Sequence, residues 1–405
     1  MEMICEHDNC SGCQACVSVC PVQAISMQED ELSTLLPVID QEKCINCGRC
    51  KNVCPQLNSL DFNQPQITYA AWSKKADFIQ NSASGGIASS LYAQALAQGI
   101  FCMGAGFARE KGVFFRQLKN TDDIRWAADS KYVYSDMREC FEQYKEQLQQ
   151  DHKCLFIGLP CQVAALKKYC DIYRMRQDNL LTVDIICHGV PNYEYLGQHI
   201  QRKELAKKRR LKRLSFRNPL TDFELKFWDN DDRIFYHRPM HEDDVYYRAF
   251  ALNLNFRKNC YNCQFSQPER VGDLTLGDFS GLGREKPFDK PQHKVSVVLV
   301  NTQAGKDYIH GLDNVVLIER EFREAYEAEG NPNLRHPSIP YTTRAIFEME
   351  YLKHHNYDRA AKIALKKVLW QWYRVKPYWL VRRYLAGHMP KGMKQMLKRI
   401  LRRGL

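Results

Sequence analysis

Short apolar runs recur through the middle of the chain. The clearest are residues 154–158, 180–186 and 295–300, and each is bounded by polar or turn-forming residues. Their length and their content of Val, Ile and Leu are typical of buried strands. The pattern therefore predicts a core with parallel-sheet character.

Helical segments alternate with these runs. Residues 85–98 predict a helix that has Ser84 as its N-cap and Gly99 just past its end. Asp136 and Glu139 form a capping-box-like start for another predicted helix, which continues to Gln149. Strands that alternate with helices are typical of an α/β fold.

Four regions follow from the pattern. They are a Cys-dense segment at residues 1–60, two core regions at 67–150 and 151–345, and a basic, aromatic segment at 346–405. The predicted fold class is α+β or α/β, with a small cysteine-rich domain, an α/β core and a helical basic tail. A hydrophobic content of 44% is enough for a packed core and excludes a disordered chain.

Composition also limits the location and the use of cysteine. No run of about 18 apolar residues occurs, so we expect no membrane-spanning helix. The first five residues include an acid and no apolar signal segment, so we expect a cytoplasmic protein. Seventeen cysteines in a reducing compartment favour metal ligation over disulfides.

Eight of the cysteines form two copies of the pattern CxxCxxCxxxCP. The first copy is Cys10, Cys13, Cys16 and Cys20, and the second is Cys44, Cys47, Cys50 and Cys54. This spacing resembles bacterial two-cluster ferredoxins, in which the fourth cysteine of each run binds the other 4Fe-4S cluster. We therefore assign Cys10, Cys13, Cys16 and Cys54 to cluster one, and Cys44, Cys47, Cys50 and Cys20 to cluster two. A pair of zinc sites is the alternative, but zinc motifs seldom repeat this spacing. Cys5 falls outside the pattern and is interpreted as a bystander.

Four further cysteines have a suggestive placement. Cys161 and Cys187 each follow a predicted strand, and strands of a parallel sheet end at the same edge, where ligands bind. Cys260 and Cys263 form a CxxC pair. Spacing alone leaves two hypotheses open: a third 4Fe-4S cluster, or two buried thiols with an unrelated CxxC.

An ordered set of motifs resembles the coenzyme F420 hydrogenase/dehydrogenase beta subunit family over about residues 67–340. The motifs are residues 82–86 (SASGG), 130–133 (SKYV), 158–162 (GLPCQ), 187–191 (CHGVP), the CxxC at 260–263, and 272–279 (GDLTLGDF). The resemblance implies an iron–sulfur flavoprotein with FAD, and it favours the third cluster on Cys161, Cys187, Cys260 and Cys263. A flavin converts between one-electron clusters and two-electron hydride chemistry.

Two motifs suggest cofactor-binding residues. Ser84, Gly85 and Gly86 open the predicted helix, whose free N–H groups and dipole favour an anion such as a flavin phosphate or an anionic substrate. An ordinary capped helix is the alternative.

Ser130 and Lys131 precede an apolar-aromatic run, and a lysine beside the flavin would stabilise the reduced anion. A surface lysine is the alternative.

His188, next to a predicted ligand, is a candidate proton relay or hydrogen-bond donor to the cluster. Gly277 and Asp278 stand in a turn-like stretch and have either a turn role or a cofactor role.

The C-terminal segment accounts for the net positive charge of the chain. Residues 353–405 hold fifteen Lys or Arg residues and one acid, Asp358, against a net charge of +11 for the whole chain. Residues 393–401 have helically spaced apolar positions among basic ones, which predicts an amphipathic helix on an anionic membrane surface. A solvated helix or a docking face for an acidic partner is the alternative. No recognition motif accompanies the basic residues, so nucleic-acid binding is not expected.

These observations predict an iron–sulfur, flavin-dependent oxidoreductase. It would exchange electrons with a redox partner protein or low-potential donor, and a hydride or two electrons with an unidentified organic substrate. Relatives encoded with exopolysaccharide genes suggest a role in that biosynthesis. Two alternatives stay open: an electron-transfer subunit without its own substrate, and a non-catalytic, membrane-docked component of a glycan assembly system.

Overall fold

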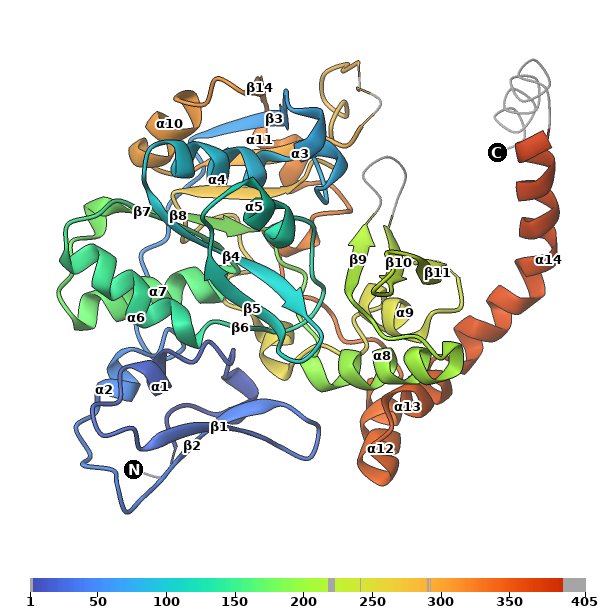
Figure 1. Cartoon of the computed structure of the whole chain (residues 1–405), viewed down its shortest axis with the longest axis horizontal. Helices are drawn as coiled ribbons and strands as arrows, with labels where there is room; N and C mark the ends of the chain where they lie inside the picture. Colours follow the sequence, from blue (N-terminus) through green and yellow to red (C-terminus); the bar gives the residue numbers. More distant parts are fainter. Residues whose placement is uncertain (1–2, 218–222, 241, 290, 292, 389–405) are drawn as a thin grey trace.

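The computed structural model describes residues 3–217, 223–240, 242–289, 291 and 293–388, with side chains described as far as residue 377. Figure 1 shows the small N-terminal module below a central sheet, and a second lobe beside that sheet. The last helix leads away from the second lobe (Figure 1). These parts confirm the predicted mixed α/β class.

The N-terminal module repeats one local design. Each CxxC loop is followed by a residue with left-handed backbone, Gln14 at φ 68° and Gly48 at φ 75°, and a four-residue helix comes next. The third cysteine of each run lies on this helix, and the fourth lies just beyond it. The elements are η1 (His7–Asn9), α1 (Ala15–Ser18), the antiparallel hairpin β1 (Ile25–Glu29) and β2 (Leu35–Ile39), and α2 (Arg49–Asn52).

The central sheet has nine strands of mixed direction. Strands β12, β8, β7 and β4 are parallel, whereas β13, β3 and β14 add to β12 in antiparallel steps. The predicted parallel character therefore holds for the middle of the sheet. In spatial order the strands are β14 (Val315–Arg320), β3 (Ile67–Ser73), β13 (Ser296–Val300), β12 (Leu274–Asp278), β8 (Leu180–Ile185), β7 (Cys154–Gly158), β4 (Phe101–Ala108), β5 (Gly112–Gln117) and β6 (Ser135–Asp136).

Helices cover both faces of this sheet, which explains the continuous apolar runs. In β7, Cys154 and Phe156 belong to the core beneath α6 and α7, whereas Leu155 and Ile157 belong to the core beneath α4. The helices around the sheet are α3 (Ala76–Gln80), α4 (Ile87–Ala97), α5 (Thr121–Ala127), α6 (Arg138–Gln149), α7 (Pro160–Ile172), α10 (Gln303–His310) and α11 (Phe322–Tyr326), with the short turns η2 (Gln177–Asn179) and η4 (Pro332–Leu334).

Two predicted helix starts are corrected. Helix α4 begins at Ile87, so Gly86, which has a φ of 78°, is its N-cap in place of Ser84. Asp136 belongs to strand β6, and its carboxylate accepts a hydrogen bond from the backbone of Arg138 at 2.9 Å without capping the helix. Gly99, with a φ of 67°, follows α4 as predicted.

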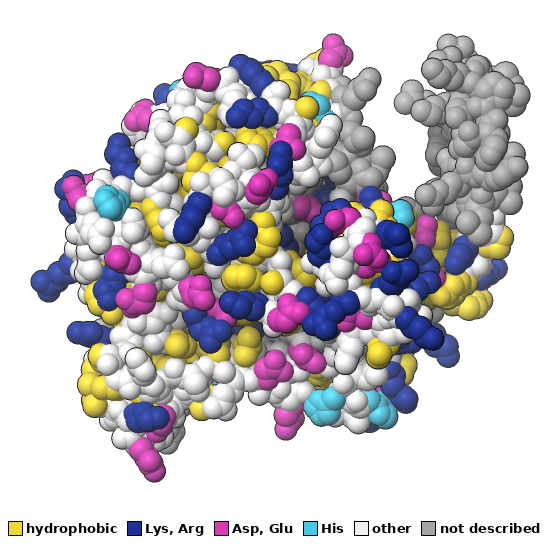
Figure 2. Space-filling model, viewed as in Figure 1, with side chains coloured by type: hydrophobic (Ala, Val, Ile, Leu, Met, Phe, Trp, Pro, Cys, Tyr) yellow, Lys and Arg dark blue, Asp and Glu magenta, His cyan; other side chains and the backbone are white. Residues whose placement is uncertain are grey.

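The second lobe is built around buried aromatic residues. An antiparallel sheet of β9 (Arg213–Arg217), β10 (Phe223–Trp228) and β11 (Ile234–Pro239) packs with helices from two distant parts of the chain. These helices are α8 (Tyr193–Lys207), α9 (Val245–Ala251), α12 (Arg344–His354) and α13 (Tyr357–Ala364), and η3 (Lys258–Asn262) lies nearby. Figure 2 shows Lys and Arg side chains gathered over this lobe.

The segment predicted as a basic tail has two parts in the structure. Phe347, Tyr351 and Tyr357 are buried in the second lobe, so α12 and α13 are core elements. Helix α14 (Lys366–His388) exposes Trp370 and Tyr373. The helix predicted at residues 393–401 lies outside the described residues. Within the described part of the chain, no helix has the length and apolar character needed to cross a membrane.

The N-terminal module is fastened to the core by buried polar contacts. The Arg257 guanidinium donates to the carbonyl oxygens of Cys10 at 3.2 Å and Leu35 at 3.0 Å, and it is 2% exposed. The Tyr134 hydroxyl donates to the carbonyl oxygen of Gly12 at 2.8 Å. Because apolar residues of α1 share one core cluster with α6 and α7, the module is an integral part of the molecule.

Candidate functional site

The structure gathers the eight module cysteines into the two predicted groups. One small pocket is lined by Cys10, Cys13, Cys16 and Cys54, and another is lined by Cys20, Cys44, Cys47 and Cys50. The crossed fourth cysteine of each run is therefore reproduced by the geometry. The roles of these side chains as cluster ligands stay predictions.

Cys5 does not lie apart from the first group, as its interpretation as a bystander implied. It is buried and lines the same pocket. Its thiol hydrogen-bonds with Cys10 and Cys54, and these bonds raise the pKa of Cys5 and lower that of Cys10 to about 6. Nothing in the spacing of the motif signals this contact, because the fold of the segment before η1 brings Cys5 to the group.

Cys161, Cys187, Cys260 and Cys263 line one pocket, although they come from three segments. Cys161 lies in the first turn of α7, Cys187 follows β8, and the CxxC pair lies on and after η3. Burial, followed by the neighbouring thiols, raises the pKa of Cys161 and brings that of Cys260 to about 11. Four thiols that repel one another as anions form a donor set suited to a cationic iron cluster.

A buried ion pair positions two of these segments, and the sequence analysis missed it. Arg270 donates to the Asp184 carboxylate at 2.8 Å and to the carbonyl oxygen of Phe265 at 3.1 Å. The other carboxylate oxygen accepts from the backbone of Gly272 at 3.0 Å. Asp184 lies on β8 before Cys187, so the pair joins that strand to the loop after Cys263. The sequence offered one sign of this ion pair, because Asp184 is an acidic residue within the apolar run of β8.

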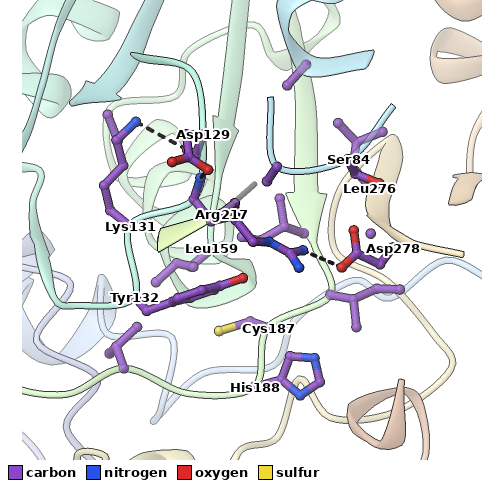
Figure 3. Close-up of a pocket in the computed structure, with 18 of the residues that line it drawn as sticks. Ser84, Asp129, Lys131, Tyr132, Leu159, Cys187, His188, Arg217, Leu276 and Asp278 are labelled. Carbon is purple, nitrogen blue, oxygen red and sulfur yellow. Dashed lines mark hydrogen bonds and ion pairs between the residues drawn. The ribbon is translucent and has the colours of Figure 1, made fainter. Parts of the chain in front are cut away.

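A large cavity of about 710 Å³ lies beside this third cysteine group. It opens at the carboxyl ends of β7, β8 and β12, the edge at which parallel α/β sheets bind ligands. Its volume is within the range of about 300–1,000 Å³ for small-molecule and cofactor sites. Figure 3 shows residues of β9 and β12, of the loop before β6 and of the segment that follows β8 around it.

The Ser84–Gly86 loop borders the cavity at the start of α4, and Ser84 and Gly86 line it. The buried Ser84 hydroxyl has no hydrogen-bond partner among the described residues. Gly85 has a packing role: a Cβ there would lie 2.5 Å from the carbonyl oxygen of Ala71, and its N–H donates to Ser296 Oγ at 2.9 Å. A larger residue at 85 would therefore disturb the sheet before it reached a ligand.

Ser130 and Lys131 also line the cavity. The ammonium of Lys131 donates to the carbonyl oxygens of Ala127 at 2.7 Å and Ala128 at 2.5 Å, so it caps the end of α5. Burial lowers its pKa to about 8, and the nearby Asp129 opposes this shift. The surface alternative is wrong, because the amine is enclosed. Its role beside a flavin stays a prediction.

Arg217 is the cavity cation that the sequence analysis missed. It ends β9 and forms an ion pair with Asp278 across the cavity (Figure 3). Its guanidinium lies 3.9 Å from the Phe223 ring centroid and 6.0 Å from that of Tyr132. Burial lowers its pKa, but Tyr132 and Asp278 outweigh burial and raise it. No motif marks Arg217, because its partners are distant in sequence.

His188, Gly277 and Asp278 also line the cavity. Burial lowers the pKa of His188, and Asp278 opposes this shift. The predicted turn at Gly277 and Asp278 is wrong, since both residues end strand β12 and pair with β13. A Cβ at Gly277 would lie 2.6 Å from the Ile186 side chain, so its glycine permits close packing.

The pockets share residues and therefore form a series. Cys13 of the first module group also lines the pocket of the third group. Cys187 and His188 line both that pocket and the large cavity. The order along the molecule is module, third cysteine group, cavity.

Comparisons with known proteins identify the family of the chain. The model described as coenzyme F420 hydrogenase/dehydrogenase, beta subunit N-term, matches residues 68–142, and the model of its C terminus matches residues 151–324. Two models of a 4Fe-4S dicluster domain match residues 9–58 and 36–96. No curated protein matches the chain.

Among solved structures, one similar chain belongs to the F420-reducing [NiFe] hydrogenase complex from Methanosarcina barkeri, studied by xenon derivatization. The identity is 15%, the TM-score is 0.43, and the match covers 76% of this chain and 94% of that one. The two halves of the family model together span more than half of the present chain. The chain is thus an iron–sulfur protein of the coenzyme F420 hydrogenase/dehydrogenase beta subunit family, with an N-terminal 4Fe-4S dicluster domain.

Proposed function

We propose that this protein is an iron–sulfur flavoprotein oxidoreductase. Electrons would pass between the two module clusters, a third 4Fe-4S cluster and FAD, with hydride or two-electron transfer to an organic substrate. The observation that carries the proposal is the series of shared residues, in which Cys13 borders the third cysteine group and Cys187 borders the cavity. A chain of adjacent redox sites that ends at a ligand-sized cavity suits this function.

The donor chemistry of the third group supports a cluster there. Each of its thiols is buried or half-buried, and burial raises the pKa of all four. Thiols are weak hydrogen-bond donors and acceptors, so hydrogen bonding among protonated thiols does not account for four of them meeting from three segments. Iron binding would release their protons and compensate the charge. Arg270, whose positive charge lowers the pKa of Cys187 against the effect of burial, would favour the thiolate form.

The cavity also fits a flavin. Tyr132 and Phe250 form a stacked aromatic wall, with ring centroids 4.3 Å apart, and the start of α4 with the unpartnered Ser84 hydroxyl offers donors on another side. When bound, a flavin supplies the conversion between single electrons and hydride. His188 lines both the cavity and the pocket of the third group, so it would accept or donate a proton between them.

The exposed end of the module supports an external electron donor or acceptor. Cys47 is the exposed member of the second group, and Ile45 beside it is 61% exposed. A redox partner protein would therefore exchange electrons at this group, far along the series from the cavity. A role in exopolysaccharide biosynthesis and attachment to an anionic membrane through residues 353–405 are parts of the proposal that rest on the resemblance and on the charge of the tail.

The first experiment is analysis of the anaerobically purified full chain for iron, sulfide and flavin. Three cubanes predict about twelve irons per chain, together with one flavin. About eight irons without flavin would contradict the proposal and leave a ferredoxin-type electron carrier. Zinc in place of iron and sulfide would contradict it as well.

A further inference from the structure

Arg217 holds an unusual position for a buried arginine. Its side chain is 5% exposed, and a single nitrogen, Nη2, pairs with Asp278. Its Nε and Nη1 atoms are buried and make no hydrogen bond to any described residue. Buried donors without acceptors destabilise a fold, and more so when they are charged, so native proteins rarely retain them without a ligand.

The surroundings show which ligand would satisfy these donors. Arg217 lines the large cavity, and the Phe223 ring on which it lies restricts its motion. The start of α4, an 11-residue helix without a side-chain cap, lines the same cavity. The buried hydroxyl of Ser84 also lines it and has no hydrogen-bond partner in the described part of the chain. Donors from a guanidinium, a helix N-terminus and a hydroxyl are complementary to an oxyanion. The carboxylate of Asp278 occupies only part of the guanidinium.

We propose that Arg217 is an anion-binding residue, which takes a phosphate-type oxyanion of the cavity ligand on Nε and Nη1. The inference deepens the proposed function, because it assigns an anionic group to the molecule that binds beside the third cysteine group. Two sources share this chemistry: the pyrophosphate of FAD, and a phosphate or carboxylate on the substrate. Asp278 then competes with the ligand for the guanidinium and lowers the affinity of the site for an oxyanion.

Inorganic pyrophosphate is the probe, and thermal unfolding of the full, flavin-free chain is the readout. Pyrophosphate should raise the melting temperature of the wild type, and Arg217→Gln should weaken pyrophosphate binding at least about tenfold, since it removes charge-assisted hydrogen bonds. Arg213→Gln is the matched control, because Arg213 lies on the same strand, is 54% exposed and pairs with Asp232 outside the cavity. Equal stabilisation of all three proteins, or of none, would overturn the assignment.

Asp278→Asn tests the assignment in the opposite direction and does not depend on the folding of the Arg217 variant. Removing the competing carboxylate should tighten pyrophosphate binding about tenfold, whereas a purely structural ion pair predicts unchanged or weaker binding. Binding that is unchanged or weaker in Asp278→Asn would therefore overturn the proposal.

Titration with FAD and with riboflavin, which lacks phosphate, separates the two sources. If Arg217 binds the flavin pyrophosphate, Arg217→Gln weakens FAD binding and leaves riboflavin binding unchanged. If it binds the substrate, both flavins bind as in the wild type, while the response to pyrophosphate is lost. A wild-type chain that binds no flavin but is stabilised by pyrophosphate would contradict the proposed function and still support the anion site.

Discussion

At the scale of single residues, the cysteines differ by what surrounds them. Cys161 and Cys170 both lie on α7, but only Cys161 lines the pocket with Cys187, Cys260 and Cys263. Cys170 is fully buried in the core between the sheet and the module. Two cysteines on one helix thus differ in role: Cys170 packs in the core, whereas Cys161 is proposed to bind the third cluster.

This contrast leads to a direct prediction. Cys161→Ala should lower the iron content from about twelve to about eight per chain, because the third cluster loses a ligand while the module keeps its own. Cys170→Ala removes a thiol from the same helix and should keep the full iron content, with a loss of stability from the cavity that it leaves. Iron and sulfide analysis of both variants decides the matter. Equal iron in the two variants would contradict the ligand assignment.

At the scale of secondary-structure elements, a buried histidine joins helices α8, α9 and α13 within the second lobe. His199 of α8 lies 2.9 Å from the Asp244 carboxylate before α9 and 3.2 Å from that of Asp358 on α13. All three side chains are at most 3% exposed, and Tyr236 donates to Asp244 at 2.6 Å. Burial opposes a charged imidazole, but the two carboxylates outweigh burial and raise the pKa of His199 above its ordinary 6.5.

The sign of this shift predicts a pH dependence of stability. The pKa of His199 is higher in the folded protein than in the unfolded chain. Its contribution to the free energy of unfolding is therefore fully present below about pH 6.5 and is lost as the pH rises through the pKa of the folded protein. Asp358→Asn should cost about 3 kcal/mol of unfolding free energy at pH 6, and the difference from the wild type should shrink at alkaline pH. Urea unfolding at pH 6 and pH 9 measures both quantities. A difference that grows toward alkaline pH would refute the charged arrangement.

At the scale of the whole molecule, the boundary of the tail matters. Buried side chains continue as far as Leu369 and Trp372, so a deletion from residue 353 would remove core side chains together with the basic helix. A deletion of residues 378–405 keeps those contacts and removes the basic segment beyond them. The structure therefore supplies a cleaner variant for testing membrane attachment.

We expect this truncated chain to lose binding to phosphatidylglycerol-containing vesicles and to keep its iron content. Lys and Arg near an anionic surface contribute about 1 kcal/mol each, and salt screens them, so binding of the full chain should fall as salt rises. Vesicle cosedimentation measures the loss, and vesicles of phosphatidylcholine alone are the control. Binding that persists after the truncation would mean that another surface attaches the protein.

The sequence by itself determined those features that depend on local spacing. The two CxxCxxCxxxCP runs, the strands around Cys154 and Leu180, and the helix ending before Gly99 follow from periodicity and short-range geometry. Tertiary structure alone decided the contacts between distant segments. Arg217 faces Asp278, Asp184 faces Arg270, and Cys5 reaches Cys54, because the fold brings together groups that no fixed spacing relates. The strand at Ser296–Val300 was recognisable from its apolar run, but its antiparallel direction was not, since hydrophobic pattern specifies burial and not the path of the connecting chain.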